Sequence, residues 1–213
     1  FRTTSSKLLW NNMVYIHITF SELSVDILKQ LSEFVDFRQD NRAFSDIRLV
    51  FESTFLGFKL ANIERVKTLN LLAKKNKVAL YTDEQDASLI NVDFKGTVDY
   101  MDDMPKVFSN SSINLNMTIR NIRTGIPLRV WDILGAGGFL LTNYQIELTD
   151  YFKNEESIVY YEDMYDCCKK AEYYLLHEDK RKQIAAKGHE LVSKKHSYIN
   201  RVEYILDVIG KMS

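Results

Sequence analysis

The chain has 213 residues, of which 46% are hydrophobic and 27% are charged, a composition typical of a globular protein that buries a sizeable core. Its formal net charge of −1 argues against a protein dedicated to binding nucleic acid, which would carry a basic excess. No run comes near the roughly 18 consecutive apolar residues of a membrane-spanning helix, so we expect no transmembrane segment.

The two cysteines and the first residue bear on the context of the protein. Cys167 and Cys168 are adjacent on a predicted helix, and their spacing favours neither a disulfide nor a metal-binding pair. We therefore expect a protein of the reducing cytoplasm. The sequence begins at Phe1 instead of a methionine, and we expect further sequence upstream of it in the full protein.

The first part of the chain, residues 1–75, is predicted to be mostly helical. Apolar residues recur at helical spacing in 21–37 and again in 51–75. At residue 77 the pattern changes, and KVALYT (77–82) predicts a short strand. The sequence therefore predicts a helical segment over 1–75, either a linker or the remnant of an amino-terminal lobe, followed by an α/β domain over 76–213.

Predicted strands and helices alternate through the second part. Strands are expected at 91–98, 112–117, 138–143 and 157–161, helices at 102–111 and 127–134, and three further helices after residue 163. Asp102 or Asp103 is expected to cap the helix 102–111, and Pro127 to start the helix 127–134, where its missing N–H costs nothing. The alternation predicts a parallel sheet sandwiched by helices, with ligands bound beyond the carboxyl ends of the strands.

The loop 116–126 follows one of these strands and is the first candidate site. It contains Asn116, Thr118, Arg120 and Arg123, and it leads through Gly125 and Ile126 into the helix that begins at Pro127. A helix N-terminus carries partial positive charge and free N–H donors, and two arginines precede it here. Together these groups predict an anion or diphosphate site. A solvated basic loop is the alternative.

Asp132 is the second candidate, because it lies one turn beyond the start of the same helix. A carboxylate there can accept hydrogen bonds from a sugar diol, such as a ribose whose phosphates lie at the helix N-terminus. The alternative is an ion pair between Arg129 and Asp132, which would contribute only a few tenths of a kcal/mol.

The glycines of GAGGF (135–139) are predicted to be structural. A dinucleotide-binding fingerprint would need a third glycine where the chain has Leu140, and it would need a strand before it and a helix after it. We expect Gly135 or Gly137 to end the helix instead.

The four histidines have no ligand spacing, and Ser193 replaces the second histidine of a zinc-protease motif, so no metal site is predicted.

Three stretches in a fixed order carry a resemblance to a known family: GTVDYMDDMPKVFSNSSINLN, GIPLRVWDILGAGGFLLTN and HSYINR. Over roughly residues 60–205 the chain closely resembles the carboxyl-terminal half of the CgeB-like, group-1 glycosyltransferases of GT-B architecture. The resemblance implies a Rossmann-like lobe that holds a nucleotide sugar, while an amino-terminal lobe holds the acceptor. It also implies that no metal or other cofactor is needed.

Position by position, the resemblance places Asp132 where relatives have a ribose-binding glutamate, Gly125 and Ile126 in the turn under the diphosphate, and Arg129 in a P-x-R segment. HSYINR matches a tail motif that we interpret as packing. Relatives with a pair of glutamates have the first one eight residues earlier, where this chain has Thr124. Many relatives also have an arginine and a lysine near the first strand of this lobe, where this chain offers only Lys77. Diphosphate binding would then depend on Arg120, Arg123 or Arg129, and the catalytic residues stay unassigned.

The function expected from the resemblance is transfer of a sugar from a nucleoside-diphosphate sugar to an unknown glycan, protein or small-molecule acceptor. The chain would supply the donor-binding lobe and would be incomplete or inactive alone. The alternative is a non-catalytic glycan-binding, partner-binding or structural module that keeps the same fold.

Overall fold

The computed structural model describes residues 56–119, 122 and 124–212. The chain divides into two compact units between Asn62 and Ile63, and the second unit contains the rest of the chain. Helix α4, Gly57–Ala73, confirms the helical pattern in 51–75 from residue 57 onward. The helix predicted at 21–37 lies outside the described residues, and the domain boundary after residue 75 stays a prediction.

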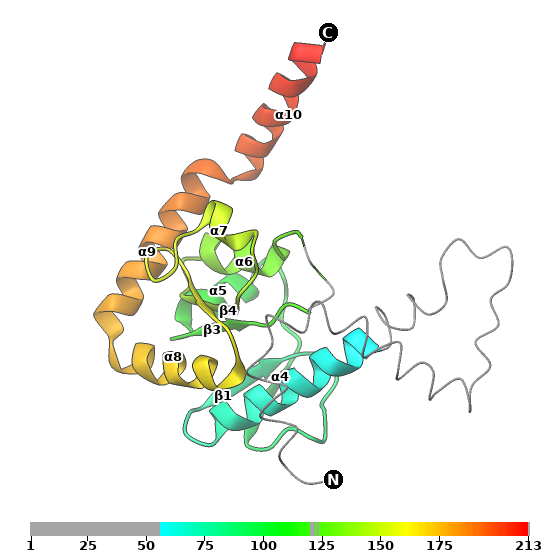
Figure 1. The fold of residues 1–213 in the computed structure, drawn as a ribbon, viewed down its shortest axis with the longest axis vertical. Helices are drawn as coiled ribbons and strands as arrows, with labels where there is room; N and C mark the ends of the chain where they lie inside the picture. Colours follow the sequence, from blue (N-terminus) through cyan, green and yellow to red (C-terminus); the bar gives the residue numbers. More distant parts are fainter. Residues whose placement is uncertain (1–55, 120–121, 123, 213) are drawn as a thin grey trace, which may run out of the picture. The chain divides into compact units, whose positions relative to one another are not determined.

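Parallel strands form the centre of the second unit, as the alternating pattern predicts (Figure 1). Strand β1, Val78–Tyr81, pairs with β2, Val92–Gly96. A second sheet has the order β3-β4-β5, with bounds Asn114–Asn116, Leu140–Asn143 and Val159–Tyr161. Because all these pairs are parallel, the carboxyl ends of the strands in each sheet meet at one edge.

The helices follow the predicted order. They are α5 (Met104–Asn110), α6 (Leu128–Gly135), α7 (Leu148–Tyr151), α8 (Met164–Leu176), α9 (Glu178–Lys195) and α10 (Tyr198–Met212). Among the elements of the described residues, the four-residue α7 alone has no predicted counterpart, because one turn is too short to establish a helical period.

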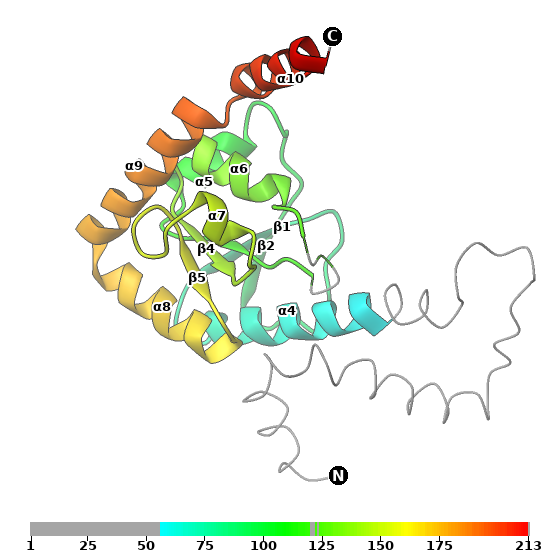
Figure 2. The same cartoon turned by 45° about the horizontal axis from the view of Figure 1, so that its top comes forward.

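Helices cover both faces of the β3-β4-β5 sheet. Successive residues of a strand point to opposite faces, and Leu140 of β4 joins a core cluster with α6, whereas Leu141 joins a cluster with α8. Ile158 and Val159 divide between the two clusters in the same way. Figure 2 shows α6 and α8 on opposite sides of these strands. The predicted fold class, a Rossmann-like α/β sandwich, is confirmed for the described part of the chain.

Glycines end α6 and turn the chain into β4. Gly137 has the left-handed φ of +76°, and its N–H donates to the carbonyl of Leu134 at 3.0 Å. The N–H of Gly138 donates to the carbonyl of Ile133 at 2.9 Å, which completes a Schellman cap. A Cβ on Gly138 would stand 2.6 Å from Asn114 Nδ2, so this position also needs the smallest residue for close packing. The predicted cap at Gly137 is confirmed.

The N-cap of α5 is Asp103, one of the two residues predicted for it. Asp103 occupies the N-cap position but makes no capping bond with its side chain, which pairs instead with Lys106 at 3.1 Å. Asp99 holds the turn that precedes α5, because its Oδ1 accepts the N–H groups of Met101 at 2.8 Å and Asp102 at 2.7 Å. The predicted position of the N-cap is therefore confirmed at Asp103, whereas the side-chain hydrogen bonds to the preceding turn come from Asp99.

Candidate site at the carboxyl edge of the strands

Polar side chains connect the ends of β3 and β4 at the start of the candidate loop. Asn116 Nδ2 donates to Thr142 Oγ1 at 2.9 Å and to Thr118 Oγ1 at 3.0 Å. Asn143 Oδ1 accepts the N–H of Thr118 at 2.8 Å, and its Nδ2 donates to the Thr118 carbonyl at 3.0 Å. The side-chain amide of Asn143 thus pairs with the backbone of Thr118 as a neighbouring strand would. These contacts give Asn116 and Thr118 a clear role in fixing where the loop leaves β3.

The middle of the loop lies outside the described residues at 120, 121 and 123, which include the candidates Arg120 and Arg123. The end of the loop is described. Gly125 has a left-handed φ of +99°, and its N–H donates to the carboxylate of Glu147, which stands at the start of α7. Ile126 packs against the core cluster beneath α6. A carboxylate of the protein itself therefore lies at the backbone N–H where an anion was predicted.

Arg129 lies on the first turn of α6 and contacts α5. Its guanidinium is 5.4 Å from the centre of the Phe108 ring, and Nη1 contacts Met104 Sδ. No ion pair joins Arg129 to Asp132 in the described part of the chain, so the alternative reading of these two residues as a helical pair does not hold. Arg129 is a half-buried residue on the first turn of α6.

Asp132 meets a tyrosine from another part of the chain. The Tyr100 hydroxyl donates to Asp132 Oδ1 at 3.0 Å, across 32 residues of sequence. Tyr100 lies in the turn between β2 and α5, and its side chain is half exposed. The hydrogen bond to Asp132, followed by burial, raises the pKa of Tyr100, so the phenol stays protonated as a donor. Sequence reasoning missed Tyr100, because no local spacing connects it to Asp132.

The HSYINR stretch packs beside this site. The His196 ring lies 5.1 Å from the Trp131 ring and 5.4 Å from that of Tyr151, and the Arg201 guanidinium lies 5.6 Å from the centre of the Trp131 ring. Burial and then the charges of Arg201 and Lys195 lower the pKa of His196. The interpretation of this motif as packing agrees with these contacts. It buttresses Trp131, the residue before Asp132.

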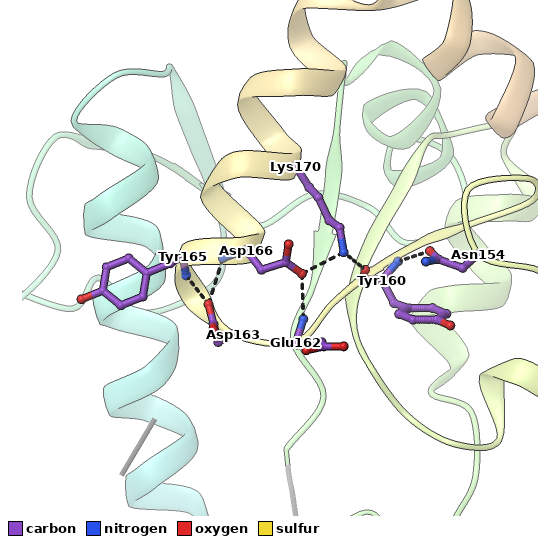
Figure 3. A network of polar contacts seen from close by, with 7 residues as sticks. All are labelled: Asn154, Tyr160, Glu162, Asp163, Tyr165, Asp166 and Lys170. Atoms are coloured by element: carbon purple, nitrogen blue, oxygen red, sulfur yellow. Dashed lines mark hydrogen bonds and ion pairs between the residues drawn. The ribbon is translucent and has the colours of Figure 1, made fainter. Parts of the chain in front are cut away.

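A second polar cluster connects β5 with the start of α8 (Figure 3). Asp163 caps α8 by accepting the N–H groups of Tyr165 and Asp166 at 2.8 and 2.9 Å. Lys170 Nζ donates to Asp166 Oδ2 at 2.8 Å and to the Tyr160 carbonyl at 2.7 Å. The groups of this cluster satisfy one another, so we assign it to holding α8 on the sheet.

The residues that could bind a metal ion and the two cysteines are further candidates for chemistry in the described part of the chain. Among the residues that the structure describes, no group of three or more His, Cys, Asp or Glu side chains could hold a metal ion. Cys167 and Cys168 are free thiols on α8, and burial raises the pKa of both.

None of the described helices combines the length and the apolar character that crossing a membrane requires.

Comparison with known proteins gives a family and a fold. The model of a family described as glycosyl transferase-like matches residues 61–207. No curated protein matches the chain. The crystal structure of TarM is similar over 67% of this chain, with a TM-score of 0.54 and 14% sequence identity. The matched region is 31% of the TarM chain, so this sequence spans about a third of that protein.

Proposed function

The chain belongs to the glycosyl transferase-like family, and from this premise we propose that it is the donor-binding lobe of a glycosyltransferase. Its substrate would be a nucleoside-diphosphate sugar, and within the family we assign it to the CgeB-like group that its three motifs resemble. The diphosphate would lie at Gly125 and the start of α6, and the ribose at Asp132.

The observation that carries this proposal is that Asp132 and Gly125 each make a hydrogen bond to another group of the protein. In both cases that group has the same hydrogen-bonding chemistry as the part of the nucleotide sugar proposed to bind there. At Asp132 a hydroxyl donates to the carboxylate, as a ribose hydroxyl would. At Gly125 a carboxylate accepts the backbone N–H, as a phosphate oxygen would. The two positions belong to one short stretch, because Gly125 lies just before Pro127, the N-cap of α6, and Asp132 lies on the second turn of that helix.

The chemistry proposed for this lobe is stabilisation of the departing nucleoside diphosphate. Negative charge develops on the diphosphate as the bond to the sugar breaks, and helix-start N–H groups and cations stabilise it there. Arg129 supplies a half-buried cation at the first turn of α6. Arg120 and Arg123 are the further candidates, and we propose that no metal takes part.

Binding of nucleotides tests the site. We expect UDP, GDP or one of their sugar derivatives to bind in isothermal titration calorimetry, and Asp132→Ala to weaken that binding by about tenfold or more, since a lost hydrogen bond to a charged group is worth roughly 1.5–3 kcal/mol. Asp179→Ala, on the exposed first turn of α9, is the matched control and should bind like the wild type. Absence of binding by all of these nucleotides, or wild-type binding by Asp132→Ala, would overturn the proposal.

A non-catalytic binding module is the second candidate, and one departure from the resembled pattern favours it. Thr124 stands where relatives with a pair of glutamates have the first. A turnover assay on the full-length protein with a panel of nucleotide sugars separates the two functions. The transferase releases nucleoside diphosphate, whereas a module binds the nucleotide sugar and leaves it intact.

A further inference from the structure

We propose that Tyr100 is a positioning residue for ribose at this site, so that Tyr100 and Asp132 together distinguish ribonucleotides from deoxyribonucleotides. The inference rests on the proposed function and adds a residue and a specificity to it. Its starting point is the hydrogen bond between the Tyr100 hydroxyl and Asp132 Oδ1.

Both partners are held by their surroundings. Asp99 binds the N–H groups of Met101 and Asp102 with one carboxylate oxygen, and it thereby fixes the backbone of the turn that carries Tyr100. On α6, Val130 and Ile133 are fully buried on either side of Asp132, and Trp131 is packed by the HSYINR stretch. The 3.0 Å contact therefore joins two braced elements and leaves both polar groups partly open to solvent.

The contact with Tyr100 uses one of the two carboxylate oxygens of Asp132, which accepts the phenol proton, and leaves the other to accept from a ligand. The phenol oxygen keeps lone pairs of its own, and these lie beside the carboxylate. Two acceptor atoms from different residues thus stand next to each other. A ribose presents two neighbouring hydroxyl donors, which matches this pair, whereas a 2′-deoxyribose presents only one.

The side chains near Tyr100 favour the neutral phenol over a phenolate. The hydrogen bond to Asp132, followed by burial and the charge of Asp132, raises the pKa of Tyr100, and the charge of Arg129 opposes these causes with a smaller effect. The donor proton therefore stays on Tyr100 throughout the neutral range, and the carboxylate is held in one orientation. Removal of the phenol oxygen would free the carboxylate to rotate and would take away one of the two acceptors.

Removal of the Tyr100 hydroxyl is expected to have little effect on the stability of the fold. Tyr100 is 50% exposed, and a hydrogen bond between two groups that water can reach contributes little to stability. Tyr100→Phe keeps the ring and removes only the hydroxyl. We therefore expect the fold to tolerate this change, so that an altered ligand preference reports on the site.

The test measures a ratio of affinities. UDP or GDP, whichever binds the wild type, is titrated alongside its 2′-deoxy form into wild type, Tyr100→Phe, Asp132→Asn and the control Tyr165→Phe. Tyr165 is a similarly exposed tyrosine on α8. The wild type should prefer the ribonucleotide by about tenfold or more, because a site built to bind a hydroxyl rejects the analogue that lacks it. Tyr100→Phe should lose most of this preference, and Tyr165→Phe should keep it.

The outcomes separate the inference from the function on which it rests. If Asp132→Asn weakens binding but Tyr100→Phe retains the wild-type preference, the role of Tyr100 is overturned and the nucleotide site stands. If no nucleoside diphosphate binds, or if Asp132→Asn binds like the wild type, both fall. A thermal unfolding curve for each variant, expected to match the wild type within about 2 °C, excludes a loss of fold as the cause.

Discussion

Glu147 and Tyr100 are two side chains that lie where parts of a nucleotide sugar are proposed to bind. Tyr100 is neutral and can stay as part of the site. Glu147 is half-buried, and its carboxylate lies on the Gly125 N–H, so it competes with a diphosphate both for the donor and through its negative charge. Binding of the diphosphate at Gly125 therefore requires Glu147 to move away.

Glu147→Gln is expected to tighten the binding of nucleoside diphosphates by about three- to tenfold, because the repulsion of like charges is removed while an amide oxygen can still accept the Gly125 N–H. Titration calorimetry at low and moderate salt measures the gain, which should shrink as salt screens the charges. Glu190→Gln, which removes an exposed carboxylate from α9, is the control. Weaker binding by Glu147→Gln would mean that the carboxylate assists the donor instead of opposing it.

At the scale of elements, the position of α6 depends on close packing against α9 and on the junction between α9 and α10. Gly188 of α9 brings its backbone so close that a Cβ would stand 2.4 Å from the Ser157 carbonyl oxygen and 2.8 Å from Leu134 Cδ2. His189 Nδ1 lies 3.0 Å from the Leu134 carbonyl oxygen. These contacts hold the end of α6, the helix that carries Arg129 and Asp132.

Gly188→Ala is expected to destabilise the protein by about 1–3 kcal/mol, because the crowded backbone must shift to admit one methyl group. Gly210→Ala is the matched control on α10, where a Cβ would meet nothing within 4 Å. The control should be neutral or stabilising by up to about 1 kcal/mol through helix propensity. Chemical denaturation measures both. Equal effects of the two substitutions would contradict the packing described here.

Acid is expected to weaken the junction of α9 and α10. The folded state lowers the pKa of His196, so the unfolded chain binds a proton more readily than the folded chain. The resulting stability is present above the ordinary histidine pKa of about 6.5 and is lost as the pH falls through the lower, folded value. Thermal unfolding at pH 7.5 and pH 5 should therefore show a smaller acid-induced loss for His196→Phe than for the wild type. An equal loss would exclude His196 as a contributor.

At the scale of the whole molecule, the sequence predicts the elements well and the contacts between them poorly. The strands and the longer helices follow from hydrophobic period and from Pro127 and Gly137, which act within a few residues of where they stand. The contact of Tyr100 with Asp132 joins segments that follow strands of two different sheets, whereas the contact of Glu147 with Gly125 joins segments that follow two strands of one sheet. Such neighbours are set by topology, because 32 and 22 residues separate the partners.

The proposed role as a donor-binding lobe bears on what the chain can do alone. A donor-binding lobe cannot position an acceptor for transfer. We therefore expect this chain to bind a nucleoside-diphosphate sugar without transferring its sugar, whereas the full-length protein turns it over. Product release measured for both forms tests this expectation. Turnover by the 213-residue chain at the full-length rate would contradict it.

A crystal structure of the chain with a bound nucleoside diphosphate tests the central claim most directly. The account predicts that the ribose hydroxyls lie within hydrogen-bond distance of Asp132, that a phosphate oxygen accepts the Gly125 N–H, and that Glu147 has left that position. Electron density for the nucleotide at another place, with Glu147 still bound to Gly125 and no ligand at Asp132, would contradict it.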